Sequence, residues 1–154
     1  MTTSINIVDI VGENVAVINI ATIPVTHPTF LSSEMWLQNL QDDAGYPLVF
    51  LERPITEQGK VLPQGNPQST YDLNVWLFAG TTRQDSPQSE IEPLLSTSKD
   101  MKRQLVILLQ RDRRIERINS YSVEEISQTQ NLDINPCGVW LKINLTVIDP
   151  LTVC

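Results

Sequence analysis

Residues 138–148 read Gly-Val-Trp-Leu-Lys-Ile-Asn-Leu-Thr-Val-Ile, and they carry the clearest structural pattern of the chain. Apolar side chains stand at every second position of this stretch from its second residue on. The gaps between them are mostly filled by Trp140, Lys142, Asn144 and Thr146. A period of two places alternate side chains on opposite faces of a β-strand. The stretch therefore predicts a strand with one buried face and one polar or partner-facing face.

Upstream of this strand lies a long amphipathic pattern that predicts the longest helix of the chain. Its inward-facing residues recur at spacings of three and four, at Ile91, Leu94, Leu95, Ser98, Met101, Leu105, Leu108 and Leu109. Pro93 fits the first turn, where its missing amide hydrogen has no helical partner to lose. The helix is expected to end near residues 111–114.

Other strands are predicted on both sides of this helix. Residues 46–53 form a compact apolar run before Pro54 and predict a strand buried on both faces. Alternation returns over residues 71–78, whereas residues 115–127 form a weaker strand. Between the first two strands, residues 55–69 are rich in glycine, proline and polar side chains, which predicts a long exposed loop.

The N-terminal segment supports two interpretations. Residues 4–20 are rich in β-branched side chains, and Ile7, Val8 and Val11 fit a helical stripe with Ser4 as its cap. The same residues also fit two strands broken at Gly12. The pattern leaves both open, and residues 1–30 are a candidate arm or a pair of extra strands.

A short helix is expected before the first buried strand. Residues 21–31 contain two prolines and predict an extended connection. Ser32 or Ser33 is a suitable cap for a helix running to about Asp43, with Gly45 as its stop signal. With 154 residues the chain is expected to form one domain of class α+β. Its architecture would be an antiparallel sheet of four or more strands with the long helix packed on one face and a short N-terminal helix.

Composition narrows the possible functions. The formal net charge is −7, which disfavours an ordinary DNA- or RNA-binding module. A chain with two cysteines and one histidine poorly suits the usual zinc site or a disulfide framework, so a reduced, intracellular protein without a metal or other cofactor is expected. No segment approaches the roughly 20 apolar residues that span a bilayer, and the first residues lack a signal-peptide pattern.

No catalytic residue is predicted. The chain has neither a glycine-rich phosphate loop nor the Gly-x-Ser-x-Gly pattern of a nucleophile elbow. His27 lies in a proline-rich connection, where a loop-packing role is favoured over catalysis. The acidic pairs Asp42-Asp43 and Glu124-Glu125 lie in polar surroundings and are interpreted as solvated surface.

The charge pattern points to an interface instead. Seven of the eleven basic residues fall in one short segment, at Lys99, Lys102, Arg103, Arg111, Arg113, Arg114 and Arg117. Cations at the end of a helix stabilise its dipole, which accounts for two or three of them. Alternatively, the cluster meets an acidic patch of a neighbouring subunit, at Asp42-Asp43 or at Glu90 and Glu92. Trp140, on the polar face of its strand, predicts a second buried layer or a subunit contact.

The order and spacing of several segments resemble a known group of proteins. The segments are Tyr46-Pro47-Leu48-Val49-Phe50-Leu51-Glu52, Thr70-Tyr71-Asp72-Leu73, the helix end at 108–112, Leu132-Asp133-Ile134-Asn135, and Gly138-Val139 with the closing strand and Cys154. Together, over roughly residues 30–154, the chain resembles tail-terminator and tail-completion proteins of the head–tail neck of tailed bacteriophages. No single motif is diagnostic.

The resemblance implies a virion structural protein that forms a ring, usually sixfold, at the tail end or head–tail junction. Its partners would be copies of itself, the tail tube protein and head–tail connector proteins, and assembly would take place in the host cytoplasm. DNA would pass an acidic channel without being held. Two other classes stay open: a soluble adaptor that binds a partner through a sheet edge, and a small carboxylate-dependent hydrolase.

Overall fold

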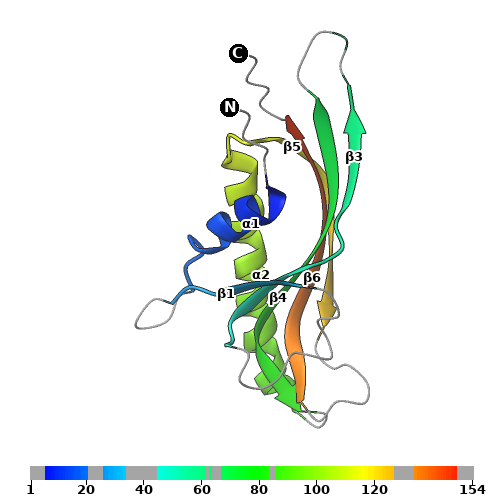
Figure 1. Ribbon diagram of the computed structural model, residues 1–154. Helices are drawn as coiled ribbons and strands as arrows, with labels where there is room; N and C mark the ends of the chain where they lie inside the picture. Colours follow the sequence, from blue (N-terminus) through cyan, green and yellow to red (C-terminus); the bar gives the residue numbers. More distant parts are fainter. Residues whose placement is uncertain are drawn as a thin grey trace.

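The computed structural model describes residues 6–20, 26–33, 45–61, 63, 67–83, 86–126 and 134–148. Two helices and six strands follow one another in this part of the chain (Figure 1). They are α1 (Ile7–Val15), β1 (Thr29–Ser33), β2 (Leu48–Glu52), β3 (Thr56–Lys60), β4 (Gln68–Arg83), α2 (Gln88–Arg111), β5 (Ile115–Ile126) and β6 (Ile134–Ile148). In these residues neither helix combines the length and apolar character needed to cross a membrane.

All six strands belong to one sheet, in the order β1-β2-β4-β6-β5, with β3 beside β4. β1 runs parallel to β2, and every other neighbouring pair is antiparallel. The predicted α+β class is therefore confirmed, although the sheet is mixed and not purely antiparallel. Residues 46–53 were predicted to contain a buried strand, and β2 confirms this with four fully buried residues in succession.

Both helices lie on the same side of the sheet (Figure 1). The long helix α2 turns Met101, Leu105 and Leu109 towards the sheet and buries all three completely. The main core forms where these side chains meet alternate residues of the strands, among them Tyr71, Leu73, Val75, Leu77, Val139, Leu141, Ile143, Leu145 and Val147. The predicted period of two in β4 and β6 and the helical period of α2 are thus both confirmed.

The N-terminal segment is a helix, as the first of the two interpretations proposed. α1 buries Ile10, Val11 and Val15 against the main core, and Asn6 caps it by accepting a 3.0 Å hydrogen bond from the Val8 amide. Ser4 lies outside the described residues. Gly12 does not break the helix, and a Cβ added there would come within 3.0 Å of the Phe30 ring.

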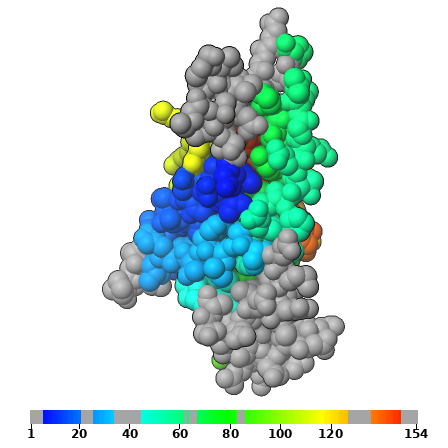
Figure 2. Space-filling view, in the orientation of Figure 1, coloured from blue at the N-terminus to red at the C-terminus, as the bar shows by residue number. Residues whose placement is uncertain are grey.

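β1 contains both serines that were predicted to cap a short helix. Ser32 and Ser33 lie in a strand, and Ser32 Oγ donates a 3.0 Å hydrogen bond to Leu51 O of β2. The prediction of a helix capped by Ser32 is wrong, because parallel pairing with β2 extends the backbone through Ser33, whereas a helix capped by Ser33 would begin outside the described residues. The rest of the expected helix, including Asp43, falls outside the described residues. Figure 2 shows residues 26–33 running across the surface beside α1.

β3 corrects the predicted loop over residues 55–69. Thr56–Lys60 form a strand that pairs with residues 68–72 of β4. All five residues are exposed, so the predicted exposure is right whereas the predicted absence of a strand is wrong. A strand that buries neither face leaves no apolar period in the sequence, because only its backbone hydrogen bonds hold it.

At Gly138 the backbones of β4 and β6 approach each other closely. A Cβ added to Gly138 would lie 1.8 Å from the carbonyl oxygen of Leu77. The pairing register shifts beside this position, between Phe78 and Gly80 of β4. Glycine in a strand marks a close approach of two backbones, and at this position no larger residue fits.

Candidate functional site

The basic cluster predicted from the sequence lies on α2, on the turn after it and at the start of β5. Most of its members have partners in the same subunit. Lys99 pairs with Glu125 of β5, and this hydrogen bond raises the pKa of Lys99. Arg103 pairs with Asp100 at 2.8 Å, one turn earlier on the helix. The surface made by this cluster is therefore partly neutralised within the subunit.

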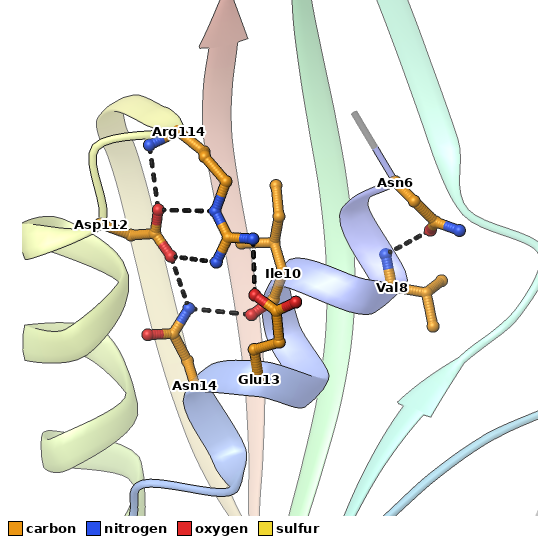
Figure 3. A network of polar contacts seen from close by, with 7 residues as sticks. All are labelled: Asn6, Val8, Ile10, Glu13, Asn14, Asp112 and Arg114. Carbon is orange, nitrogen blue, oxygen red and sulfur yellow. Dashed lines mark hydrogen bonds and ion pairs between the residues drawn. The ribbon is translucent and has the colours of Figure 1, made fainter. Parts of the chain in front are cut away.

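Arg114 is the centre of a network that attaches α1 to the end of α2 (Figure 3). Its guanidinium donates to both carboxylate oxygens of Asp112, at 3.0 and 2.8 Å, and lies 2.5 Å from Glu13 of α1. Asn14 donates to Asp112 at 2.9 Å and to the Ile10 carbonyl at 2.8 Å. Arg114 thus acts inside the subunit, a role that its position in the sequence did not indicate.

The same network fixes the charge of Asp112. Hydrogen bonds from Arg114, and a further one from Asn14, hold the pKa of Asp112 well below its ordinary value despite partial burial. The pKa of Arg114 is raised by the hydrogen bonds to Asp112 and Glu13. Both groups are therefore ionised over the whole neutral range, and the link between the helices does not depend on pH near 7.

Three basic residues remain available for contacts. Arg111 and Arg113 are exposed, and neither forms an ion pair with another residue in the described part of the chain. The Lys102 ammonium lies 5.8 Å from the centre of the Tyr121 ring, in the range of a weak cation–π contact. Arg117 pairs with Glu116 at 3.4 Å.

Of the proposed acidic counterparts, the structure places only Glu90 and Glu92. Asp42 and Asp43 fall outside the described residues. Glu90 and Glu92 lie in the first turns of α2, at the opposite end from Arg111, which is roughly 30 Å away at 1.5 Å per residue. Glu92 interacts electrostatically with Lys99 in the same subunit, whereas a contact of Glu90 or Glu92 with Arg111 or Arg113 would require two copies.

Trp140 belongs to a second apolar layer on the sheet face opposite the helices. Its ring stacks on Trp76 at 4.5 Å with an interplanar angle of 7°, and its indole nitrogen donates to Asn74 at 3.1 Å. Lys142 Nζ lies 3.8 Å from the centre of the Trp140 ring. This outer layer consists of buried Leu48, Phe50, Trp76 and Phe78 with Tyr46, Ile126 and Trp140 packed on them. The second buried layer predicted from Trp140 is confirmed, and a subunit contact there stays a prediction.

A ladder of polar side chains continues this face towards the other end of β6. Asn144 donates to Asp72 at 2.6 Å and accepts from Asn119 at 2.7 Å. Asn119 also donates to Thr146 at 2.8 Å. Two of these residues, Asp72 and Asn144, line a hollow of about 420 Å³ on the sheet surface. The ladder joins polar groups of three strands, which makes this face an ordered polar surface.

The remaining candidates from the sequence are not brought together. Glu124 pairs with Lys142 at 3.4 Å and Glu125 with Lys99, from opposite faces of β5, so the two carboxylates do not share a site. Nδ1 of His27 lies 2.7 Å from the Ile18 carbonyl, which agrees with a loop-packing role. Burial raises the pKa of the Cys137 thiol to about 11. No group of three or more potential metal ligands occurs among the residues that the structure describes.

A sheet edge was a candidate binding site from the sequence, but the sequence did not indicate which strands form the edges. β1 and β5 are the outermost strands, and both expose many of their residues. No composition or spacing signal distinguishes an edge strand from an inner one here, because the difference lies in which strands pair. No family model matches the chain, and a search of curated proteins finds no match.

Proposed function

We propose that the protein is a structural subunit of a tailed-bacteriophage virion that forms a ring at the tail end or head–tail junction. The role is that of a tail-terminator or neck protein. The resemblance over residues 30–154 supports this, together with a long helix packed on one face of a largely antiparallel sheet. A net charge of −7 suits a channel wall that DNA passes without being held.

The observation that carries the proposal is the exposure of β3. Ordering the backbone costs about 1–2 kcal/mol per residue, and in a subunit this cost is mainly offset by burial of side chains. All five residues of β3 are exposed, so within the subunit only the ladder to β4 offsets it. A strand of this kind gains its cover from a partner, and the proposed partners are the tail tube protein or a neighbouring ring.

The adaptor remains a second candidate because no other strand in the described part of the chain pairs with the outer edge of β5. An adaptor of this kind would be a stable monomer that binds an extended peptide along the edge. The hydrolase is weaker, since the carboxylates of Glu124 and Glu125 point to opposite faces of β5 and each faces a lysine.

Light scattering of the purified protein, over a range of protein and salt concentrations, tests the ring, with negative-stain images of any large species. The expected result is a closed ring with a central hole. Replacing Arg111 and Arg113 together by Glu should lower the assembled fraction, whereas Arg114 is left intact because it holds α1 to α2. A strict monomer under every condition would contradict self-assembly and favour the adaptor.

A further inference from the structure

The two outermost strands, β1 and the C-terminal part of β5, stand opposite each other across the sheet. The pairing registers of neighbouring strands join into continuous rows that run from β1 to β5. One row contains Ser32, Leu51, Val75, Leu141 and Val123. The next contains Leu31, Phe50, Trp76, Trp140 and Glu124. Among the described residues, no further strand pairs with β1 or β5 at the ends of these rows.

Backbone hydrogen bonds show which groups of β1 point outward. The Thr29 amide donates to Pro47 O at 2.9 Å, and Ser33 O accepts from the Arg53 amide at 3.1 Å. Thr29 and Ser33 therefore face β2. Because the direction alternates along a strand, the backbone groups of Phe30 and Ser32 point away from the sheet.

The same alternation identifies the outward groups of β5. In an antiparallel pair, two directly opposite residues either bond to each other or both point away to the next strands. The backbone hydrogen bonds between β1 and β2 fix the direction for β2, and the pairing registers extend it through β4 and β6 to β5. By this rule the backbone groups of Glu124 point towards β6. The backbone groups of Tyr121, Val123 and Glu125 then point outward.

Strand direction makes these two edges complementary. β1 is parallel to β2, and the pairs β2–β4, β4–β6 and β6–β5 are each antiparallel. β1 therefore runs opposite to β5. If the β1 of a second copy continued the sheet beside β5, the two strands would pair in the antiparallel arrangement already used by most of the sheet.

The residues whose backbone groups point outward have their side chains on the helix side of the sheet at both edges. Phe30 and Val123 pack against the main core on the helix side, and Glu125 pairs with Lys99 of α2. Residues bonded directly opposite each other in an antiparallel pair have side chains on the same face. A junction between these edges therefore keeps α2 of both copies on one face of the joined sheet, as repetition around a ring requires.

The parts of β1 and β5 that would meet contain neither a bulge nor a proline, and their two charged residues, Glu124 and Glu125, are each paired with a lysine of the same subunit. Proteins blunt free edges with bulges, charges or proline. β5 has two register shifts, next to Ile115 and Ile118, whereas its residues 121–126 pair regularly. β1 reads Thr-Phe-Leu-Ser-Ser and carries no charge. The bulges of β5 thus lie in its first part, residues 115–120, which does not stand in the same rows of the sheet as β1.

We infer that subunits join through β1 of one copy and residues 121–126 of β5 of the next, paired antiparallel, so that the sheet continues across the boundary. The partner is a second copy of this chain. The inference rests on the proposed self-assembly and specifies its contact. The contact is head-to-tail, because different surfaces meet, and repetition of such a contact closes a ring when the rotation allows it.

Proline substitutions at outward positions test the two edges separately. Ser32→Pro and Glu125→Pro each remove an outward amide donor without removing a donor of the internal ladder. Ser32→Ala and Glu125→Ala are the matched controls, since they lose the same side-chain contacts but keep the amide. Light scattering should show an assembly dissociation constant raised roughly tenfold or more by each proline relative to its alanine control. Circular dichroism confirms that each variant is folded.

Mixing the two proline variants gives the sharpest result. Ser32→Pro retains an intact β5 and Glu125→Pro an intact β1, so an equimolar mixture should form dimers and nothing larger, because only one junction remains. If either proline variant fails to fold, Leu31→Lys adds a charge to the exposed side of β1 and should likewise reduce assembly.

Normal rings from both proline variants would overturn the inference and leave the proposed self-assembly intact. Two monomeric variants that do not combine on mixing would overturn it as well. A wild-type protein that never assembles would contradict both the ring and this contact.

Discussion

Two segments of β4, residues 73–78 and residues 68–72, hold their neighbouring strands in different ways. Over residues 73–78, one face packs against the main core below α2 and the other carries Trp76 and Phe78 of the outer layer. Over residues 68–72, β4 supports β3, which is exposed at every residue. Side-chain packing stabilises the strands around residues 73–78, whereas β3 beside residues 68–72 is held by its backbone hydrogen bonds. A substitution near residues 73–78 should therefore lower the free energy of unfolding much more than a similar substitution in β3.

The largest difference is expected between two glycines. Gly138→Ala would place a methyl group 1.8 Å from Leu77 O, so β4 and β6 must separate. We expect the free energy of unfolding to fall by about 3 kcal/mol or more. Gly59 of β3 has no atom within 4 Å of such a group, and Gly59→Ala should change stability by about 0.5 kcal/mol or less. Urea unfolding of both variants measures the contrast, and equal losses would contradict it.

Removal of the outer layer should have a somewhat smaller effect. Trp76 is buried between Trp140 and Phe78, with ring centres 4.5 and 6.2 Å away. Trp76→Ala should lower the free energy of unfolding by about 3 kcal/mol, the lower end for a buried aromatic residue. The control Gln58→Ala, in exposed β3, should stay within about 0.5 kcal/mol of wild type. If Trp76→Ala cost less than the control, the outer layer would not be a packed core.

The smallest loss of stability is expected at the ion pair of Asp112 and Arg114, which attaches α1 to the end of α2. The folded-state pKa of Asp112 is depressed, so its contribution to stability is present above the ordinary pKa of about 4 and declines as pH falls below it. Arg114 is 41% exposed, so solvent screening limits the contribution to about 1 kcal/mol.

Asp112→Asn should therefore destabilise the protein at pH 6 and flatten the loss of stability below pH 4. Urea unfolding at several pH values between 6 and 2.5 measures both slopes. Identical slopes for the variant and the wild type would show that Arg114 does not hold the charge of Asp112 in the folded state.

Elements with a strong side-chain period were predictable from the sequence. β4, β6 and α2 each alternate or repeat in step with their own geometry, because one face of each meets the same core. The class α+β follows from their order. The outer layer was also predicted, because Trp140 is an aromatic residue on an otherwise polar face of its strand.

β1 and β3 depended on the tertiary structure. Their residues, Thr-Phe-Leu-Ser-Ser and Thr-Glu-Gln-Gly-Lys, have no apolar period to fill a core, and each becomes a strand because a neighbour offers a backbone edge. The role of Arg114 was equally hidden, as one of its partners, Glu13, is far away in the sequence.

The sequence by itself thus determined which faces of the longest elements are buried, because burial follows from the period of each element's own side chains. Only the tertiary structure decided which strands stand at the edges, which way their backbone groups point and which cations are already paired. Those properties depend on hydrogen bonds and contacts between segments far apart in the chain, and they are the properties on which the proposed assembly rests.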